Sequence, residues 1–209
     1  MQVIILRAWC CRRVRCAIAS GSPRRRELLR GLDLPFEVRL KKGIKESYPS
    51  TLAAENVPEY ISREKAAAYE VGEDEILLTA DTIVELDGRI FGKPKDEDDA
   101  CCMLSELSGR THRVITGVTL TSATEQRSFS VTTEVTFKKL SSEEISYYVS
   151  HYHPLDKAGA YGIQEWIGYI GCEGLKGSYY NVMGLPVQRI YAELMNMEKV
   201  ELKSLKNEK

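Results

Sequence analysis

The sequence predicts a single α/β domain built on a long, twisted, mixed β-sheet that is flanked by helices. Strand-like and helix-like patterns alternate along most of the 209 residues, which is typical of an α/β chain. Two long stretches rich in β-branched residues, 111–122 and 127–140, follow one another directly and favour an antiparallel pair. No linker divides the chain, so we expect one domain of two lobes with a cleft between them.

The first elements carry clear end signals. "VRCAIAS" (14–20) has the pattern of a short buried strand that runs into a turn. Ser22 is a good N-cap and Pro23 suits the first helical position, which predicts a helix over 23–31 that ends at Gly31. "PFEVRL" (35–40) alternates as a strand does, and the polar stretch 41–56 is a predicted loop.

The middle of the chain contains the clearest local signals. "VPEYISREKAAAYEV" (57–71) predicts a helix with a proline in its first turn. A continuous apolar strand reaches Thr79, and the Asp87-Gly88 pair predicts a β-hairpin turn. Residues 96–107 have a helical pattern.

The C-terminal third begins with "SSEE" (141–144), which has capping-box spacing before a helix. A glycine-rich, aromatic loop follows Pro154, and "GLPVQRIYAELMNM" (184–197) predicts a terminal helix. We therefore place the domain at 14–197, an N-terminal extension at 1–13 and a charged, frayed tail at 198–209.

The charge distribution limits the classes of partner. The net charge is −1, which gives no overall reason to expect a nucleic acid or a membrane. The charge is uneven, because residues 1–30 hold eight arginines and one glutamate, +7, and the remainder is −8. The apolar run "VIIL" is too short for a signal peptide, and no stretch approaches the roughly 20 apolar residues of a membrane span.

The six cysteines form no C-x-x-C pair, and none of the three histidines lies at ligand spacing from a cysteine. These patterns argue against a zinc site and indicate reduced thiols in a cytoplasmic protein.

"SGSPRRR" (20–26) is the first candidate site. Ser20 and Ser22 bring hydroxyls and free backbone N–H groups to a helix N-terminus, which favours an anion, and arginine adds forked donors for phosphate. Successive helical side chains diverge by about 100°, so Arg24, Arg25 and Arg26 cannot all face one ligand. Arg25 is expected near the buried stripe and Arg26 in solvent. The alternative is a solvated basic turn.

"TADTIV" (79–84) is the second candidate. We expect Asp81 at the carboxyl end of a buried strand, where α/β sheets place their ligands, able to bind Mg²⁺ or to accept a proton from water. Lys93 follows the hairpin, and Glu46 and Lys65 are further charged groups that could join Asp81. The alternatives are a turn cap at Asp81 and solvated positions for the other three.

"PLDKAGAYGIQ" (154–164) is the third candidate. Its small residues allow a ligand to approach the backbone, and Gln164 offers a donor and an acceptor that suit the edge of a nucleobase. A purely structural turn is the alternative. His112, in a strand context, is expected to be a packed, hydrogen-bonded residue and not a catalyst.

Six motifs together resemble one family. "ASGSPRRRELL", "REKA", "TADTIVELDGRIFGKP", "LSGRTHRVITGV", "PLDKAGAYGIQ" and "GSYYNVMGLP" are similar, in order and spacing over residues 14–195, to the Maf nucleotide pyrophosphatases, also called septum-formation-like proteins. The resemblance implies a fold related to the inosine-triphosphate pyrophosphatases and a divalent metal, usually Mg²⁺ with Mn²⁺ as the alternative. It also implies water attack on a nucleoside triphosphate between its α- and β-phosphates.

The resemblance also implies residue roles. Asp81 matches the general base or metal ligand, and Glu46 matches an acidic position that is thought to hold metal. The positions that hold the triphosphate correspond to Ser20, Arg24, Arg25, Lys65 and Lys93. A bound triphosphate would then neutralise the arginines. Family members are often dimers, so a homodimer is a further expectation.

Arg24, Thr82 and Gln164 resemble the dTTP/UTP branch and not the branch that acts on 7-methyl-GTP, which has tryptophan, glutamine and glutamate there. A neutral amide suits uracil or thymine, whereas a carboxylate suits a cationic methylated guanine. Residues 1–13 precede the usual start of the family, and Glu165 replaces a common glycine beside Gln164.

Two other functions stay open at the level of sequence. One is a nucleotide-binding regulator of septum formation without turnover, which the intact set of charged motif residues disfavours. The other is nucleic-acid binding through the arginine-rich N-terminus, which the acidic remainder of the chain and the lack of paired aromatic residues disfavour.

Overall fold

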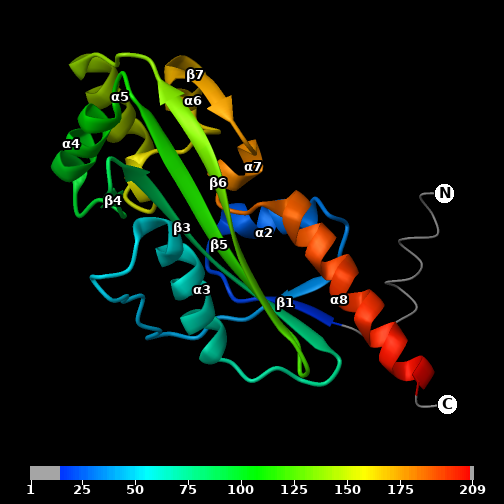
Figure 1. Cartoon of the computed structure of the whole chain (residues 1–209). Coiled ribbons are helices and arrows are strands. Elements are labelled where there is room, and N and C mark those ends of the chain that lie inside the picture. Colours follow the sequence, from blue (N-terminus) through cyan, green and yellow to red (C-terminus); the bar gives the residue numbers. More distant parts are fainter. Residues whose placement is uncertain (1–14, 208–209) are drawn as a thin grey trace.

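A computed structural model describes residues 15–207 of the chain, with side chains from 15 to 197. Its seven strands form one mixed sheet with the order β2-β1-β3-β5-β6-β7, and β4 pairs with β3 as well (Figure 1). β1 is parallel to β2 and β3, and all other pairs are antiparallel. The predicted mixed sheet is confirmed. The strands are β1 (Arg15–Ile18), β2 (Phe36–Val38), β3 (Glu75–Leu86), β4 (Arg89–Phe91), β5 (Thr111–Thr121), β6 (Gln126–Phe137) and β7 (Cys172–Lys176).

Helices cover both faces of this sheet, as predicted. α3 packs across β3 and β5 on one face, and α2 and α8 share a hydrophobic cluster with β1, β3 and β5 on the other. α4, α5 and α6 gather at the far end of the long strands (Figure 1). The helices are α2 (Pro23–Arg30), α3 (Val57–Ala67), α4 (Glu97–Leu107), α5 (Ser142–Tyr152), α6 (Trp166–Gly171), α7 (Tyr179–Val182) and α8 (Val187–Asn207), with short 3-10 turns η1 (Ala54–Asn56) and η2 (Ala158–Ala160).

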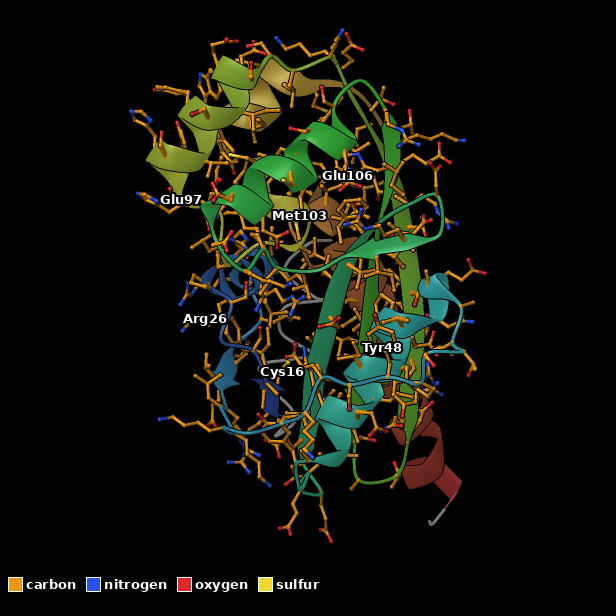
Figure 2. The ribbon with its side chains drawn as sticks, turned by 90° about the vertical axis from the view of Figure 1, so that its left-hand side faces the viewer. Cys16, Arg26, Tyr48, Glu97, Met103 and Glu106 are labelled. Atoms are coloured by element: carbon orange, nitrogen blue, oxygen red, sulfur yellow. The ribbon has the colours of Figure 1, made fainter. Side chains whose placement is uncertain are left out.

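Of the three hydrophobic clusters in the described residues, the two larger lie at different ends of the long strands, and we call them the first and the second lobe. One contains the first half of β3 with α2 and α8, and the other contains the end of β3 with α4, α5 and α6. In the second lobe Glu97, Met103 and Glu106 are spaced along α4 (Figure 2), and Met103 is buried. The cleft between the lobes stays a prediction.

Local signals fix several element ends where they were expected. The Ser22 hydroxyl accepts from the backbone N–H of Arg25 at the start of α2, and Gly31 caps its end. Asp87 and Gly88 both have positive φ in the β3–β4 hairpin, and Ser141 with Glu144 forms the predicted capping box of α5. α8 continues to Asn207, beyond the predicted domain limit at residue 197.

Gly117 of β5 allows α3 to lie directly against the sheet. A Cβ atom at this position would lie 2.2 Å from the backbone nitrogen of Glu59 and 2.2 Å from the carbonyl carbon of Pro58. Gly117 is the register partner of Asp81 on β3. The close approach therefore sets the distance between the first turn of α3 and the strand that carries Asp81.

His112 is the packed strand residue that the sequence predicts. It is 1% exposed, and its Nε2 is hydrogen-bonded to the Tyr161 hydroxyl at 2.7 Å. Burial lowers the pKa of His112 from 6.5 to about 4. The imidazole is therefore neutral in the folded protein at neutral pH.

Replacing Gly117 with alanine is expected to destabilise the fold by about 3 kcal/mol, because the added methyl group would collide with backbone that cannot move aside cheaply. Urea denaturation of the variant measures this loss. The matched control is Gly72→Ala, where a Cβ atom would meet only Glu75 Oε2, at 4.0 Å. Equal stability of the two variants would contradict the packing argument.

Stability is expected to fall as the pH decreases from 6.5 to 4. In this window the unfolded state protonates His112 and the folded state does not, so protons favour unfolding, by about 3 kcal/mol in total. Urea denaturation across this range should show a shallower slope for His112→Gln than for the natural protein.

Candidate active site

The candidate site surrounds a gap along one edge of β3. On that edge β1 pairs with β3 up to Leu78, and β4 pairs with β3 from Val84 onward. No strand of the described chain, residues 15–207, pairs with this edge over 79–83, whereas the other edge pairs with β5 throughout. Asp81 was expected at the end of a strand, and this was wrong. It lies within β3, because pairing with β5 carries the strand through the polar residues to Leu86.

Arg25 occupies this gap from the direction of α2. Its Nε donates to the backbone carbonyl of Gly184 at 2.8 Å, and its two terminal nitrogens donate to the carbonyl of Ala80 and to the Thr82 hydroxyl, each at 2.9 Å. Thr82 in turn shares a 3.0 Å hydrogen bond with Thr116 of β5. The guanidinium thus joins α2, β3 and the loop before α8, and two of its five N–H groups make no bond to these acceptors.

Asp81 points to the opposite face of the sheet from Thr82, because side chains alternate along a strand. Lys65 of α3 places its Nζ 2.8 Å from Asp81 Oδ1 and 2.9 Å from Glu46 Oε1. Asp81 and Lys65 are 13% and 12% exposed, whereas Glu46 is 54% exposed. The structure therefore brings the three predicted residues together around one ammonium group.

The electrostatics of this cluster favour the charged form of Glu46. Partial burial acts to raise the pKa of Glu46, but the hydrogen bond from Lys65 and the charges of Lys65, Lys93 and Arg25 hold it below its ordinary value. Burial lowers the pKa of the Arg25 guanidinium, and Asp81 opposes this. Around the Glu46 and Asp81 carboxylates the cations Arg25, Lys65 and Lys93 leave an excess of one positive charge, which suits an anionic ligand.

Glu46 and Asp81 fit the donor chemistry of a hard divalent cation. Mg²⁺ is usually held by one or two carboxylates together with substrate phosphates, and these two carboxylates already converge on one positive group. Within the described residues no group of three or more histidine, cysteine or acidic side chains is arranged to hold a metal. A cation here would depend on the substrate for its remaining ligands.

Ser20 and Lys93 occupy the margins of the site. Ser20 is 7% exposed, and its hydroxyl accepts from the backbone N–H of Ser22 at 3.2 Å in the turn before α2. Lys93 is exposed directly after Gly92, whose carbonyl accepts from the N–H of Gly159 at 3.0 Å. This bond connects the end of the hairpin to the glycine-rich loop.

Arg24 is bonded to the loop that contains Gln164 through an acid that the sequence analysis did not single out. Arg24 donates to Asp156 Oδ2 at 2.9 Å, and Asp156 lies in the loop that leads to Gln164. The Gln164 Oε1 atom is buried without a hydrogen-bond partner in the described part of the chain. The motif "PLDKAGAYGIQ" contains Asp156, but the sequence analysis predicted roles only for Gln164 and for the small residues of this motif. Gly184 and Thr116 gave no local signal.

Arg26 makes one long contact, 3.4 Å, to the carbonyl of Gly21 and lies at the outer edge of the molecule (Figure 2). Residues 1–13, predicted as an extension, lie outside the described residues. No helix in the described range is both long and apolar enough to cross a membrane.

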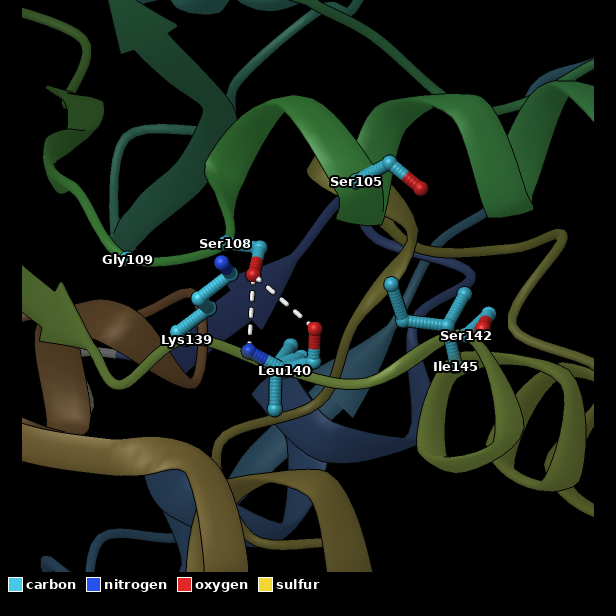
Figure 3. A pocket seen from close by; sticks show the side chains of 7 residues that line it. All are labelled: Ser105, Ser108, Gly109, Lys139, Leu140, Ser142 and Ile145. Carbon is cyan, nitrogen blue, oxygen red and sulfur yellow. Dashed lines mark hydrogen bonds between the residues drawn. The ribbon is translucent and has the colours of Figure 1, made fainter.

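A pocket of about 500 Å³ lies elsewhere, between α4 and the start of α5 (Figure 3). Ser108 hydrogen-bonds to both backbone groups of Leu140 at its margin. None of the predicted site residues lines it. The lining residues are Ser105, Ser108, Gly109, Lys139, Leu140, Ser142 and Ile145.

Known proteins match this chain over most of its length. The chain is 62% identical over 182 residues to a dTTP/UTP pyrophosphatase of Phocaeicola vulgatus, covering 86% of this chain and 94% of the relative. It is 51% identical over 187 residues to a dTTP/UTP pyrophosphatase of Bacteroides fragilis, covering 88% and 97%. A solved HAM1 protein from Coxiella burnetii is 14% identical with a TM-score of 0.47, covering 88% and 99%. Residues 15–197 match the model of the family described as Maf-like protein, and the chain belongs to this family.

Proposed function

We propose that this chain is a nucleoside triphosphate pyrophosphatase that hydrolyses dTTP and UTP to the monophosphate and pyrophosphate with a divalent cation, Mg²⁺ or Mn²⁺. The observation that carries the proposal is the 62% identity to a dTTP/UTP pyrophosphatase across 94% of that relative. The Glu46–Lys65–Asp81 cluster supports it, because it places two carboxylates that can hold a cation or accept a proton beside the unpaired segment of β3 that Arg25 also contacts.

Asp81 is the proposed general base. A water molecule adds its oxygen to phosphorus, its proton passes to the Asp81 carboxylate, and the anhydride bond between the α- and β-phosphates breaks to release pyrophosphate. Lys65 and Lys93 hold phosphate oxygens, and Ser20 with the N-terminus of α2 extends this anion site. The cation, when bound by Glu46 and Asp81, neutralises phosphate charge.

The base of the nucleotide is proposed to lie near Arg24, Thr82 and Gln164. The Gln164 side chain carries one acceptor and one donor group, so it can pair with the N3–H group and a neighbouring carbonyl that uracil and thymine share.

Replacing Asp81 with asparagine is expected to lower pyrophosphate release from dTTP and UTP about 1,000-fold, because the amide cannot take the proton from water. The assay detects pyrophosphate in the presence of Mg²⁺. Asp98→Asn, at an exposed position of α4, is the matched control and should keep the natural rate. A full rate for Asp81→Asn would remove Asp81 from the mechanism.

Replacing Arg25 with lysine is expected to cost about 3 kcal/mol of stability as well as activity, because an ammonium group cannot reach all three acceptors. Thermal denaturation and pyrophosphate release measure the two losses. Arg26→Lys is the matched control, because it makes the same chemical change one residue away and can lose only a 3.4 Å contact to the Gly21 carbonyl. It should change neither the melting temperature nor the rate of pyrophosphate release. An active, fully stable Arg25→Lys variant would contradict the role of Arg25 in stability and its proposed role in binding the triphosphate.

A further inference from the structure

Lys157 is a buried cation that the proposed reaction does not use. It is 7% exposed, and its Nζ lies 2.7 Å from Asp156 Oδ1 and 3.2 Å from Glu165 Oε1. A buried ammonium group is costly unless it is paired with good geometry. Both partners belong to the loop that contains Gln164, so this cation holds two points of that loop together.

The far side of Glu165 is fixed by Tyr148 of α5. The Tyr148 hydroxyl donates to Glu165 Oε2 and accepts from the backbone N–H of Gly162 at 3.0 Å. Burial and the neighbouring Glu165 raise the pKa of Tyr148, so the hydroxyl keeps the proton that it donates. Tyr148 itself is fully buried, which ties the loop to the hydrophobic core of the second lobe.

Gln164 lies inside the turn that these contacts close. The backbone N–H of Glu165 donates to the carbonyl of Gly162 at 3.0 Å, which closes the turn around Ile163 and Gln164. A Cβ atom on Gly162 would lie 2.8 Å from the carboxyl carbon of Glu165, so the Glu165 side chain packs directly over the turn. The position of Gln164 therefore depends on where the Glu165 carboxylate is held.

The same set of contacts reaches Arg24. Asp156 binds Lys157 with one carboxylate oxygen and Arg24 with the other, at 2.7 Å and 2.9 Å. We infer that Lys157 and Glu165 are positioning residues that hold Arg24 and Gln164 in fixed relation and thereby set the preference for a uracil or thymine base. This inference rests on the proposed function and adds the residues that determine its selectivity.

The need for such positioning follows from the chemistry of an amide. Uracil and thymine present an N3–H donor beside carbonyl acceptors, whereas cytosine presents an N3 acceptor beside an amino donor. A glutamine side chain that rotates by 180° exchanges its oxygen and its NH₂ group and so matches either pattern. A turn held in one place limits the directions from which Gln164 can meet the base, so that one of the two amide orientations is favoured and cytosine then faces a like group.

The test compares Glu165→Gln and Tyr148→Phe with the natural protein in steady-state hydrolysis of UTP, dTTP and CTP. Glu165→Gln keeps an acceptor for Tyr148 but loses the charge that pairs with Lys157, and Tyr148→Phe keeps the ring but loses the bridging hydroxyl. For both, we expect the ratio of kcat/KM for UTP over CTP to fall about 10-fold, through a higher KM for UTP with kcat within about 2-fold.

Glu134→Gln is the matched control, because it removes an exposed ion pair to Lys176 at 3.5 Å and should leave the ratio unchanged. A natural UTP/CTP ratio in both test variants would overturn the inference even if their melting temperatures fell. If the natural protein released no pyrophosphate from UTP, the proposed function would fail on its own. Calorimetric binding of UTP and CTP would then decide the inference, with the same loss of preference expected.

Discussion

The guanidinium of Arg25 in the gap of β3 is the contact on which the arrangement of the site depends. A β-strand edge without a partner leaves carbonyl and N–H groups that must be satisfied in some other way. Here a side chain takes the place of a strand at Ala80, and its other nitrogens hold Thr82 and the loop at Gly184. A planar fork with fixed donor directions can satisfy three acceptors from separate segments, which a single ammonium group cannot. The edge therefore stays open without leaving the Ala80 carbonyl unpaired.

The gap also leaves side chains on opposite faces of one sheet beside the same unpaired edge. Asp81 points toward α3, where Lys65 lies, and Thr82 points toward α2, where Arg25 lies. At a paired position the sheet would separate these two groups. At an unpaired edge both are within reach of a molecule that lies along the edge. Gly117 completes the arrangement, because its missing side chain lets α3 approach the strand that carries Asp81.

Local signals predicted most elements, since the information they need lies within a few residues. The cap at Ser22, the turn at Asp87-Gly88 and the capping box at Ser141 are of this kind. The continuity of β3 through Asp81 and Thr82 was not predicted, because these polar residues are typical of a strand end, whereas pairing with β5 carries the strand onward. The hydrogen-bond partners of the site side chains could not be predicted from local sequence either. Arg24 and Asp156 are 132 residues apart, and Arg25 and Gly184 are 159 apart.

The three arginines at the start of α2 show that identical residues at successive positions can have different partners and different roles. Three cations at the positive end of a helix dipole are unfavourable, and the sequence left open whether they lie in solvent or are neutralised by a bound anion. The structure shows that the protein itself supplies hydrogen-bond partners for two of them, a carboxylate for Arg24 and uncharged oxygens for Arg25. These two solutions differ electrostatically. Asp156 cancels the charge of Arg24 nearby, whereas carbonyl and hydroxyl groups orient Arg25 without cancelling its charge. Arg25 can therefore support the fold and still present a full positive charge beside Asp81, where a phosphate anion would gain most from it.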